Sequence, residues 1–88
     1  MYLHLGQDTT ILSASILGIF DLDNTSQSKY TRAFLTQEEK LRHVINVSEE
    51  LPRSFLVCQE NGVTRVYLSQ LSSATLQRRV SEGATQKF

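Results

Sequence analysis

The sequence predicts a small α+β fold, in which six strands form one mostly antiparallel sheet with two helices, in the order β-β-β-α-β-β-β-α. Short apolar runs indicate strands, whereas the segment after Ser28 repeats its apolar residues at about 100° per residue, as helices do. Asn61-Gly62 lies between two apolar runs and is the usual signal for a two-residue hairpin turn. In this chain of 88 residues we expect one domain over residues 1–82 and a flexible tail over residues 83–88.

Three short strands are expected at the N-terminal end. They are Tyr2–Leu5 and Thr10–Leu12, around a turn at Gly6-Gln7-Asp8, and then Leu17–Leu22. The side-chain oxygens of Asn24–Ser26 come next and can cap the free amides of a helix start. A helix is therefore predicted to begin near Ser28.

The first helix is expected to place Tyr30, Ala33, Phe34 and Leu41 on one apolar face. We expect that face to pack on the sheet. A capping-box spacing at Thr36 and three residues later would allow the helix to break and restart there. One continuous helix is preferred over two short ones.

The second half of the chain is predicted to hold three strands and a helix. The strands are Val44–Val47, Ser54–Glu60 and Val63–Ser69, with an exposed loop at Glu49–Pro52. The loop is indicated because Pro52 disfavours helix at the residue before it. The last helix begins with Ser72 or Ser73 as its cap and runs to about Val80, with Leu76 and Val80 turned inward.

The predicted hairpin is apolar on both faces. On one side Val57 faces Val66 and Phe55 faces Leu68, and the other side carries Leu56, Cys58, Val63, Arg65 and Tyr67. A chain this small buries only about 60% of the surface that its unfolded form exposes, and large exposed apolar patches mark interaction sites. We therefore expect a homo-oligomer to cover the second face. The alternative is a sheet that curls on itself and buries both faces within one chain.

Composition disfavours several classes of protein. Cys58 is the single cysteine, so an internal disulfide is impossible. No apolar stretch approaches the ~20 residues that span a bilayer, and no cationic leader precedes an apolar run, so we expect a cytoplasmic protein without a membrane partner. Nine basic and nine acidic residues give a formal net charge of zero. Binding of nucleic acid would then require the charges to be sorted onto separate faces.

No catalytic, cofactor or metal site is predicted. The two histidines and Cys58 lack the spacing of a ligand pair, and as a nucleophile Cys58 would need a basic partner, for which Arg65 across the hairpin is the candidate. Asp21 and Asp23 could share a cation or a proton, but their preferred role is to favour the positive end of the following helix. A polar cleft that joined both carboxylates with His43 would revive an enzymatic interpretation. We expect neither an enzyme nor a small-molecule substrate.

Positive charge can collect on the first helix. Lys29, Arg32 and Lys40 fall in one stripe beside the apolar face, and Arg53 stands on the loop before the fifth strand. The simpler interpretation of the stripe is an ordinary solvated face. If the subunit repeats, however, each neutralised phosphate adds to the affinity for a duplex. Arg78-Arg79, at the predicted end of the last helix, are explained by the helix dipole.

Four segments resemble the RemB family of bacterial extracellular matrix regulators. They are Tyr2–Gly6, Gly18–Thr25, Val44–Phe55, and Tyr67–Ser69 with Ser72–Leu76, so that the resemblance runs from residue 1 to about residue 80. That family is related to RemA, a transcriptional activator of biofilm matrix operons. The resemblance implies six strands with two helices, and it implies subunits that assemble into rings and bind DNA around the rim.

The resemblance also implies which residues bind DNA. Arg32 matches a basic helix position of RemA-like chains, and Arg53 matches one member of an arginine pair before the fifth strand. The other member is replaced by one of Leu51-Pro52, and a further arginine before the third strand is replaced by Ile16. The absence of two cationic groups should lower both the affinity for DNA and its salt dependence.

Two functions are expected from these observations. The first is a non-enzymatic transcriptional regulator of extracellular matrix (biofilm) genes, which binds the phosphates of double-stranded DNA through the repeated basic rim of a homo-oligomer, with Arg53 and Arg32 as contacts and Lys29 as a helper. The second is a structural module that self-associates and modulates another regulator protein without binding DNA. The neutral charge and the missing arginines favour the second.

Overall fold

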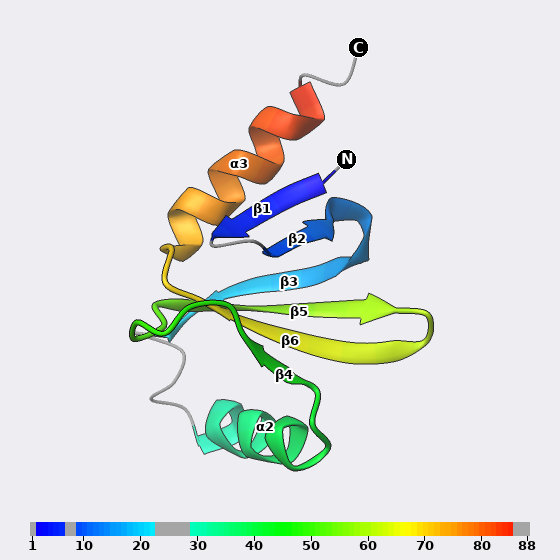
Figure 1. The fold of residues 1–88 in the computed structure, drawn as a ribbon, viewed down its shortest axis with the longest axis vertical. Coiled ribbons are helices and arrows are strands. Elements are labelled where there is room, and N and C mark those ends of the chain that lie inside the picture. Colours follow the sequence, from blue (N-terminus) through cyan, green and yellow to red (C-terminus); the bar gives the residue numbers. More distant parts are fainter. Residues whose placement is uncertain (1, 7–8, 23–28, 86–88) are drawn as a thin grey trace.

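The computed structural model of the chain describes residues 2–6, 9–22 and 29–85 (Figure 1). Its elements are β1 (Tyr2–Gly6), β2 (Thr9–Leu12), the 3₁₀ turn η1 (Ser13–Ser15), β3 (Ile16–Asp21), α2 (Lys29–Lys40), β4 (Val44–Asn46), β5 (Ser54–Glu60), β6 (Val63–Ser69) and α3 (Ser73–Thr85). The α+β class and the order of strands and helices agree with the prediction. The helix-start cap expected at Asn24–Ser26 lies outside the described residues.

The strands form two sheets, whereas one sheet was predicted. β1 and β2 make an antiparallel pair of their own, and the other strands make a four-stranded sheet in the order β3-β5-β6-β4. The division occurs because η1 redirects the chain between β2 and β3, with the Ser15 hydroxyl donating a hydrogen bond to the Leu12 carbonyl at 2.7 Å. β4 runs parallel to β6, so the larger sheet is mixed.

The β5–β6 hairpin confirms the predicted register. Val57 pairs with Val66 and Phe55 pairs with Leu68 across it. Its turn is formed by Asn61-Gly62, whose φ angles of 54° and 80° lie in the left-handed region that a two-residue hairpin turn requires. The strong local signal in the sequence therefore predicted this element correctly.

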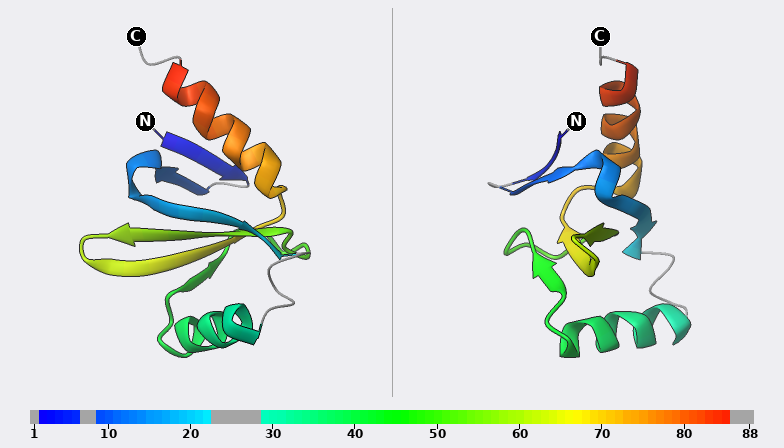
Figure 2. Two further views of the ribbon diagram at one scale, coloured as in Figure 1. Left: turned by 180° about the vertical axis from the view of Figure 1, so that it is seen from behind. Right: turned by 90° about the vertical axis from the view of Figure 1, so that its right-hand side faces the viewer.

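The core lies between the larger sheet and a layer made by the β1–β2 hairpin and α3 (Figure 2). Leu5, Leu56, Cys58 and Leu76 are fully buried there, and Tyr67 is 7% exposed. This is the sheet face that we expected a second subunit to cover. The expectation was wrong for this face, because the hairpin folds back over it within the chain. Oligomerisation itself stays a prediction.

Helix α2 is continuous, as predicted, but it is rotated relative to the predicted face. The inward stripe consists of Thr31, Phe34, Leu35 and Glu38, at the i, i+3, i+4, i+7 spacing of one helix face. Of the face predicted to pack on the sheet, only Phe34 is half-buried; Ala33 is exposed, and Tyr30 and Leu41 are 79% and 53% exposed. A buried glutamate therefore takes a position that hydrophobic periodicity alone would give to an apolar residue.

The end of α2 lacks the glycine that usually terminates a helix. Arg42 adopts φ 62° in its place, its amide donates to the Glu39 carbonyl at 3.0 Å, and the His43 amide donates to the Glu38 carbonyl at 2.9 Å. This pair of bonds is a Schellman motif, which satisfies the last carbonyls of the helix. The His43 carbonyl then accepts from the Val66 amide at 2.9 Å, which places β4 beside β6.

Helix α3 begins as predicted and ends later. The Thr75 amide donates to the Ser72 hydroxyl at 3.1 Å, so Ser72 is the N-cap. The helix continues to Thr85 instead of ending near Val80. The dipole explanation for Arg78-Arg79 was therefore wrong, because both precede the last turn, and the Arg79 guanidinium instead donates to the His4 carbonyl of β1 at 3.1 Å.

In the described part of the chain, neither helix is long and apolar enough to cross a bilayer. The proposed tail at residues 83–88 stays a prediction.

Candidate nucleic-acid interface

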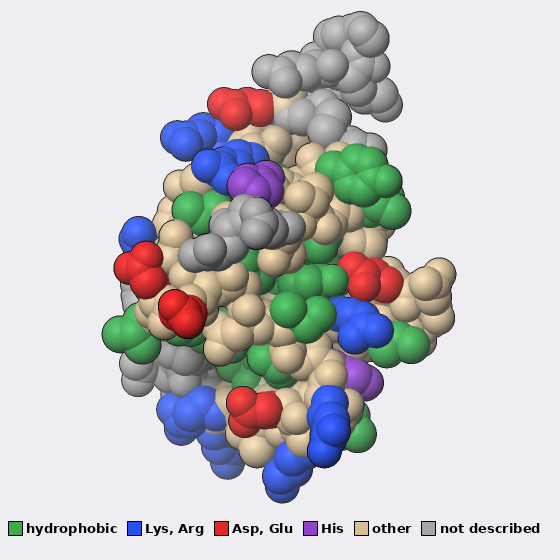
Figure 3. Space-filling view, in the orientation of Figure 1, with side chains coloured by type: hydrophobic (Ala, Val, Ile, Leu, Met, Phe, Trp, Pro, Cys, Tyr) green, Lys and Arg blue, Asp and Glu red, His purple; other side chains and the backbone are tan. Residues whose placement is uncertain are grey.

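The outer side of α2 is basic. Lys29, Arg32 and Lys40 are exposed on it, and so is Arg42 just beyond its end. Figure 3 shows these cations gathered at one end of the molecule, over α2. A separate basic group lies at the opposite end, over α3. Positive charge is thus sorted onto particular surfaces, although the whole chain is neutral.

Burial of Glu38 strengthens the positive charge of this surface. The Glu38 carboxylate is only 11% exposed and lies 2.9 Å from Nδ1 of the His43 ring. Across residues 29–42, all of which the structure describes, four exposed cations therefore face solvent beside one exposed carboxylate, that of Glu39. The sequence analysis did not predict this difference between the two glutamates.

Arg53 stands on a backbone that is fixed by both neighbouring strands. Its amide donates to the Ser69 carbonyl at 2.8 Å, and its carbonyl accepts from the Leu22 amide at 3.0 Å. The residue is exposed. Its position at the start of β5 is thus held by the sheet while the side chain remains in solvent.

A cleft of about 190 Å³ separates α2 from the loop that carries Arg53. It is lined by Leu22, Leu35, Thr36, Glu39, Val44, Pro52 and Leu68. Arg32 lies one helical turn before Thr36 on the same side of α2, and Arg53 directly follows Pro52 in the chain. The elements that carry the two arginines therefore approach the same cleft from its two sides. Lys29 lies one turn before Arg32, on the outer side of the helix.

The loop before Arg53 also carries negative charge. Glu49 and Glu50 are both exposed, so carboxylates lie within four residues of the Arg53 guanidinium along the chain. Such neighbours reduce the local attraction for phosphate. The surface around Arg53 is therefore less positive than the surface of α2.

The side of α2 away from Arg32 borders an apolar groove, which hydrophobic periodicity did not predict. The groove measures about 310 Å³ and is lined by Phe20, Tyr30, Thr31, Phe34, Phe55 and Val57. The rings of Phe20 and Phe55 stack with centroids 5.0 Å apart. Glycine at position 18 makes this possible, since a Cβ there would lie 2.7 Å from the Phe20 ring. The groove arises from the rotation of α2, which only the folded chain shows.

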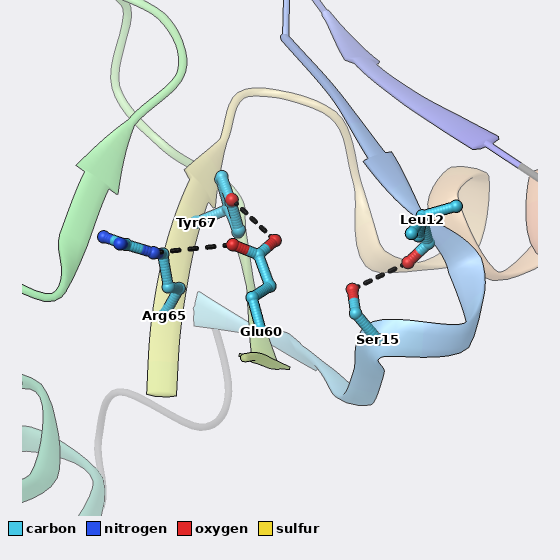
Figure 4. Close-up of polar contacts among 5 residues, drawn as sticks. All are labelled: Leu12, Ser15, Glu60, Arg65 and Tyr67. Atoms are coloured by element: carbon cyan, nitrogen blue, oxygen red, sulfur yellow. Dashed lines mark hydrogen bonds and ion pairs between the residues drawn. The ribbon is translucent and has the colours of Figure 1, made fainter. Parts of the chain in front are cut away.

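Cys58 lacks the environment of a nucleophile. Burial raises the pKa of its thiol, a hydrogen bond with Ser15 opposes part of that rise, and the Glu60 carboxylate raises the pKa by a smaller amount. Arg65, the partner that the strand register places opposite Cys58, instead pairs with Glu60 at 3.4 Å. The same carboxylate accepts a hydrogen bond from the Tyr67 hydroxyl at 3.0 Å (Figure 4). Cys58 thus packs as a small apolar side chain.

The carboxylates considered for catalysis are not gathered into a site in the described part of the chain. Asp21 ends β3, and His43 precedes β4, and these strands are the two edges of the four-stranded sheet. Asp23 lies outside the described residues. Among the described residues, no group of three or more histidine, cysteine or acidic side chains could hold a metal ion.

Comparisons with known proteins identify the relatives of this chain. The family model described as RemA-like, extracellular matrix regulatory protein A-like, matches residues 2–80. A curated relative, extracellular matrix regulatory protein B of Bacillus subtilis (strain 168), is 34% identical over 79 residues, which cover 90% of this chain and 89% of the relative. The match includes both α2 and the loop before β5, and it agrees with the resemblance found in the sequence.

Proposed function

The chain belongs to the RemA-like family, and from this membership we propose that it is a non-enzymatic transcriptional regulator of extracellular matrix genes, which binds double-stranded DNA as a homo-oligomer. Arg53 and Arg32 contact phosphates, and Lys29 assists them. The name of the B. subtilis relative supports the regulatory role, because it describes that protein as a regulator of the extracellular matrix.

The basic surface of α2 carries the proposal. It has four exposed cations and one exposed carboxylate, because the Glu38 carboxylate is buried in a contact with His43. The net positive surface supplies the attraction for phosphate that the neutral composition of the whole chain does not. The sequence analysis required such a separation of charges for binding of nucleic acid, because the chain as a whole is neutral.

Assembly makes so small a set of cations sufficient. Each phosphate neutralised on a duplex contributes a slope of about −0.9 to the dependence of log affinity on log salt, and repeated subunits multiply that contribution. Contacts of this kind position a protein on the backbone and depend on the bendability of the DNA more than on base edges. We therefore expect modest sequence preference from each subunit alone.

The test is an electrophoretic mobility shift with matrix-promoter DNA over a series of salt concentrations. Arg53→Ala and Arg32→Ala should each weaken binding and make the salt slope shallower by about 0.9 for every phosphate that the variant assembly no longer neutralises. Arg78→Ala is the matched control, because Arg78 is an exposed arginine on α3, at the opposite end of the molecule. Absence of any shift at low salt, or an equal effect of Arg78→Ala, would contradict DNA binding by this surface.

A second candidate is a self-associating module that modulates another regulator protein without contacting DNA. Two observations favour it, the exposed acids Glu49 and Glu50 beside Arg53 and the apolar groove beside α2. The same mobility shift separates the candidates. A protein that assembles normally but leaves DNA unshifted at low salt would favour the module.

A further inference from the structure

The loop that joins β4 to β5 presents a leucine to solvent from a well-held backbone. Leu51 is 89% exposed. The loop is anchored at its two ends, where the Val47 amide donates to the Leu68 carbonyl at 3.0 Å and the Arg53 amide donates to the Ser69 carbonyl. The fixed backbone therefore presents the Leu51 side chain to solvent, where it is available to a partner.

A buried serine braces the middle of this loop. The Ser48 hydroxyl donates to the side-chain oxygen of Gln70 at 2.7 Å and accepts from the Glu50 amide at 3.1 Å. Little conformational entropy is then lost when the tip of the loop, Glu49–Leu51, docks on a partner. The tip combines two carboxylates with one apolar side chain.

The groove beside α2 has the complementary chemistry. Its lining is aromatic and aliphatic apart from Thr31. Two of the lining residues, Phe20 and Tyr30, are 39% and 79% exposed to solvent. The Lys29 ammonium lies 5.8 Å from the centroid of the Tyr30 ring, so a cation stands at the rim. The groove thus offers apolar surface for a leucine and a positive charge for an adjacent carboxylate.

We infer that the tip Glu49–Leu51 of one copy docks in the groove of the next copy, with Leu51 against Phe20 and Tyr30 and the carboxylates near Lys29. None of the residues of the tip lines the groove, and Leu51 is exposed within its own chain. The contact therefore joins two different surfaces of the protein. Such a head-to-tail contact repeats from copy to copy and yields a closed ring or a filament. This inference rests on the self-association in the proposed function. It keeps Arg32 and Arg53 as the phosphate contacts, and it places Lys29, their helper, at the edge of the contact between copies.

Molar mass by light scattering, measured over a range of concentrations, tests the contact with matched pairs of variants. Leu51→Ser and Tyr30→Ser should each dissociate the assembly, with a rise in dissociation constant of about 30-fold if these residues are central to the contact. Leu12→Ser and Tyr2→Ser are the controls, because they make the same changes at leucine and tyrosine side chains that are 48% and 68% exposed elsewhere. An assembly that survives both test variants, or that dissociates equally in both controls, overturns the inference.

A mixture of the two test variants gives a sharper result. Leu51→Ser retains an intact groove and Tyr30→Ser retains an intact tip, so a head-to-tail contact predicts that the mixture forms dimers while each variant alone stays monomeric. Circular dichroism of each variant checks that both remain folded. A mixture of folded variants that stays monomeric would contradict this contact.

The mobility shift distinguishes failure of this inference from failure of the proposed function. If the Leu51→Ser variant still assembles and the protein binds DNA, the proposed function is retained and the tip–groove contact is contradicted. An assembly that depends on Leu51 and Tyr30 but leaves DNA unshifted supports the contact and removes DNA binding. A wild-type protein that is monomeric at all concentrations removes both.

Discussion

Glu38 and His43 bind each other twice at the end of α2, because the His43 amide donates to the Glu38 carbonyl and the His43 ring lies 2.9 Å from the Glu38 carboxylate. The first contact belongs to the helix terminus and the second buries an acidic side chain against β4. Together they fix the rotation of α2. That rotation decides which side of the helix presents cations and which side borders the apolar groove.

Glu38→Ala should destabilise the fold. Removing the carboxylate leaves the half-buried His43 ring without this partner, and hydrogen bonds to a charged group are worth about 1.5–3 kcal/mol. Unfolding in urea, followed by circular dichroism, measures the free energy of unfolding. Glu39→Ala is the control, since the exposed neighbour should change that energy by less than about 0.5 kcal/mol. Equal effects of the two substitutions would contradict the assigned role of Glu38.

Cys58 should resist alkylation in the native protein. The side chain has no exposed surface and its burial raises the pKa of the thiol, so both access and thiolate fraction are reduced. We expect iodoacetamide at pH 8 to label the folded chain on the order of 10³-fold more slowly than the chain in urea, because labelling requires unfolding. Mass spectrometry over time measures both rates. Rapid and complete labelling without denaturant would show that the thiol is accessible.

Tyr67 should make folding dependent on pH at alkaline values. Burial and the hydrogen bond to Glu60 raise the pKa of the Tyr67 hydroxyl to about 12 from an ordinary value of about 10. The unfolded chain therefore loses this proton first, so the contribution of Tyr67 to stability is complete below pH ~10 and falls as the pH rises toward ~12. Thermal unfolding between these values measures the loss.

Tyr67→Phe is the comparison for that experiment. The variant has no hydroxyl at this position, so its stability should fall less steeply than that of the wild type over the same interval. The difference between the two curves isolates Tyr67 from the other groups that titrate there. Parallel curves would show that the hydroxyl is not held in its protonated form by the fold.

Ser72→Ala should weaken the start of α3. The Ser72 hydroxyl accepts from the Thr75 amide, and loss of such a cap costs about 0.5–2 kcal/mol. Denaturation in urea measures the change, with Ser73→Ala as the control at the first helical residue. A larger loss from Ser73→Ala than from Ser72→Ala would place the cap one residue later.

Local signals in the sequence were enough to predict most elements. The turn at Asn61-Gly62 set the register of β5 and β6, and Ser72 marked the start of α3, because these choices depend on backbone angles and hydrogen bonds within a few residues. The end of α2 was harder to predict, since Arg42 takes the left-handed conformation that glycine usually supplies. Its stability comes from His43, which binds both the helix end and β6.

The sequence by itself determined the class of fold and the order of its elements, since short-range periodicity and turn residues encode them directly, and its resemblance to known chains indicated the RemA-like family. Only the tertiary structure decided that the β1–β2 hairpin leaves the main sheet and covers the Leu56 face, and that α2 turns Glu38 inward and Tyr30 outward. The first outcome depends on contacts between residues far apart in the chain, and the second on the contact of the Glu38 carboxylate with His43, which buries an acidic side chain where periodicity alone favours an apolar one.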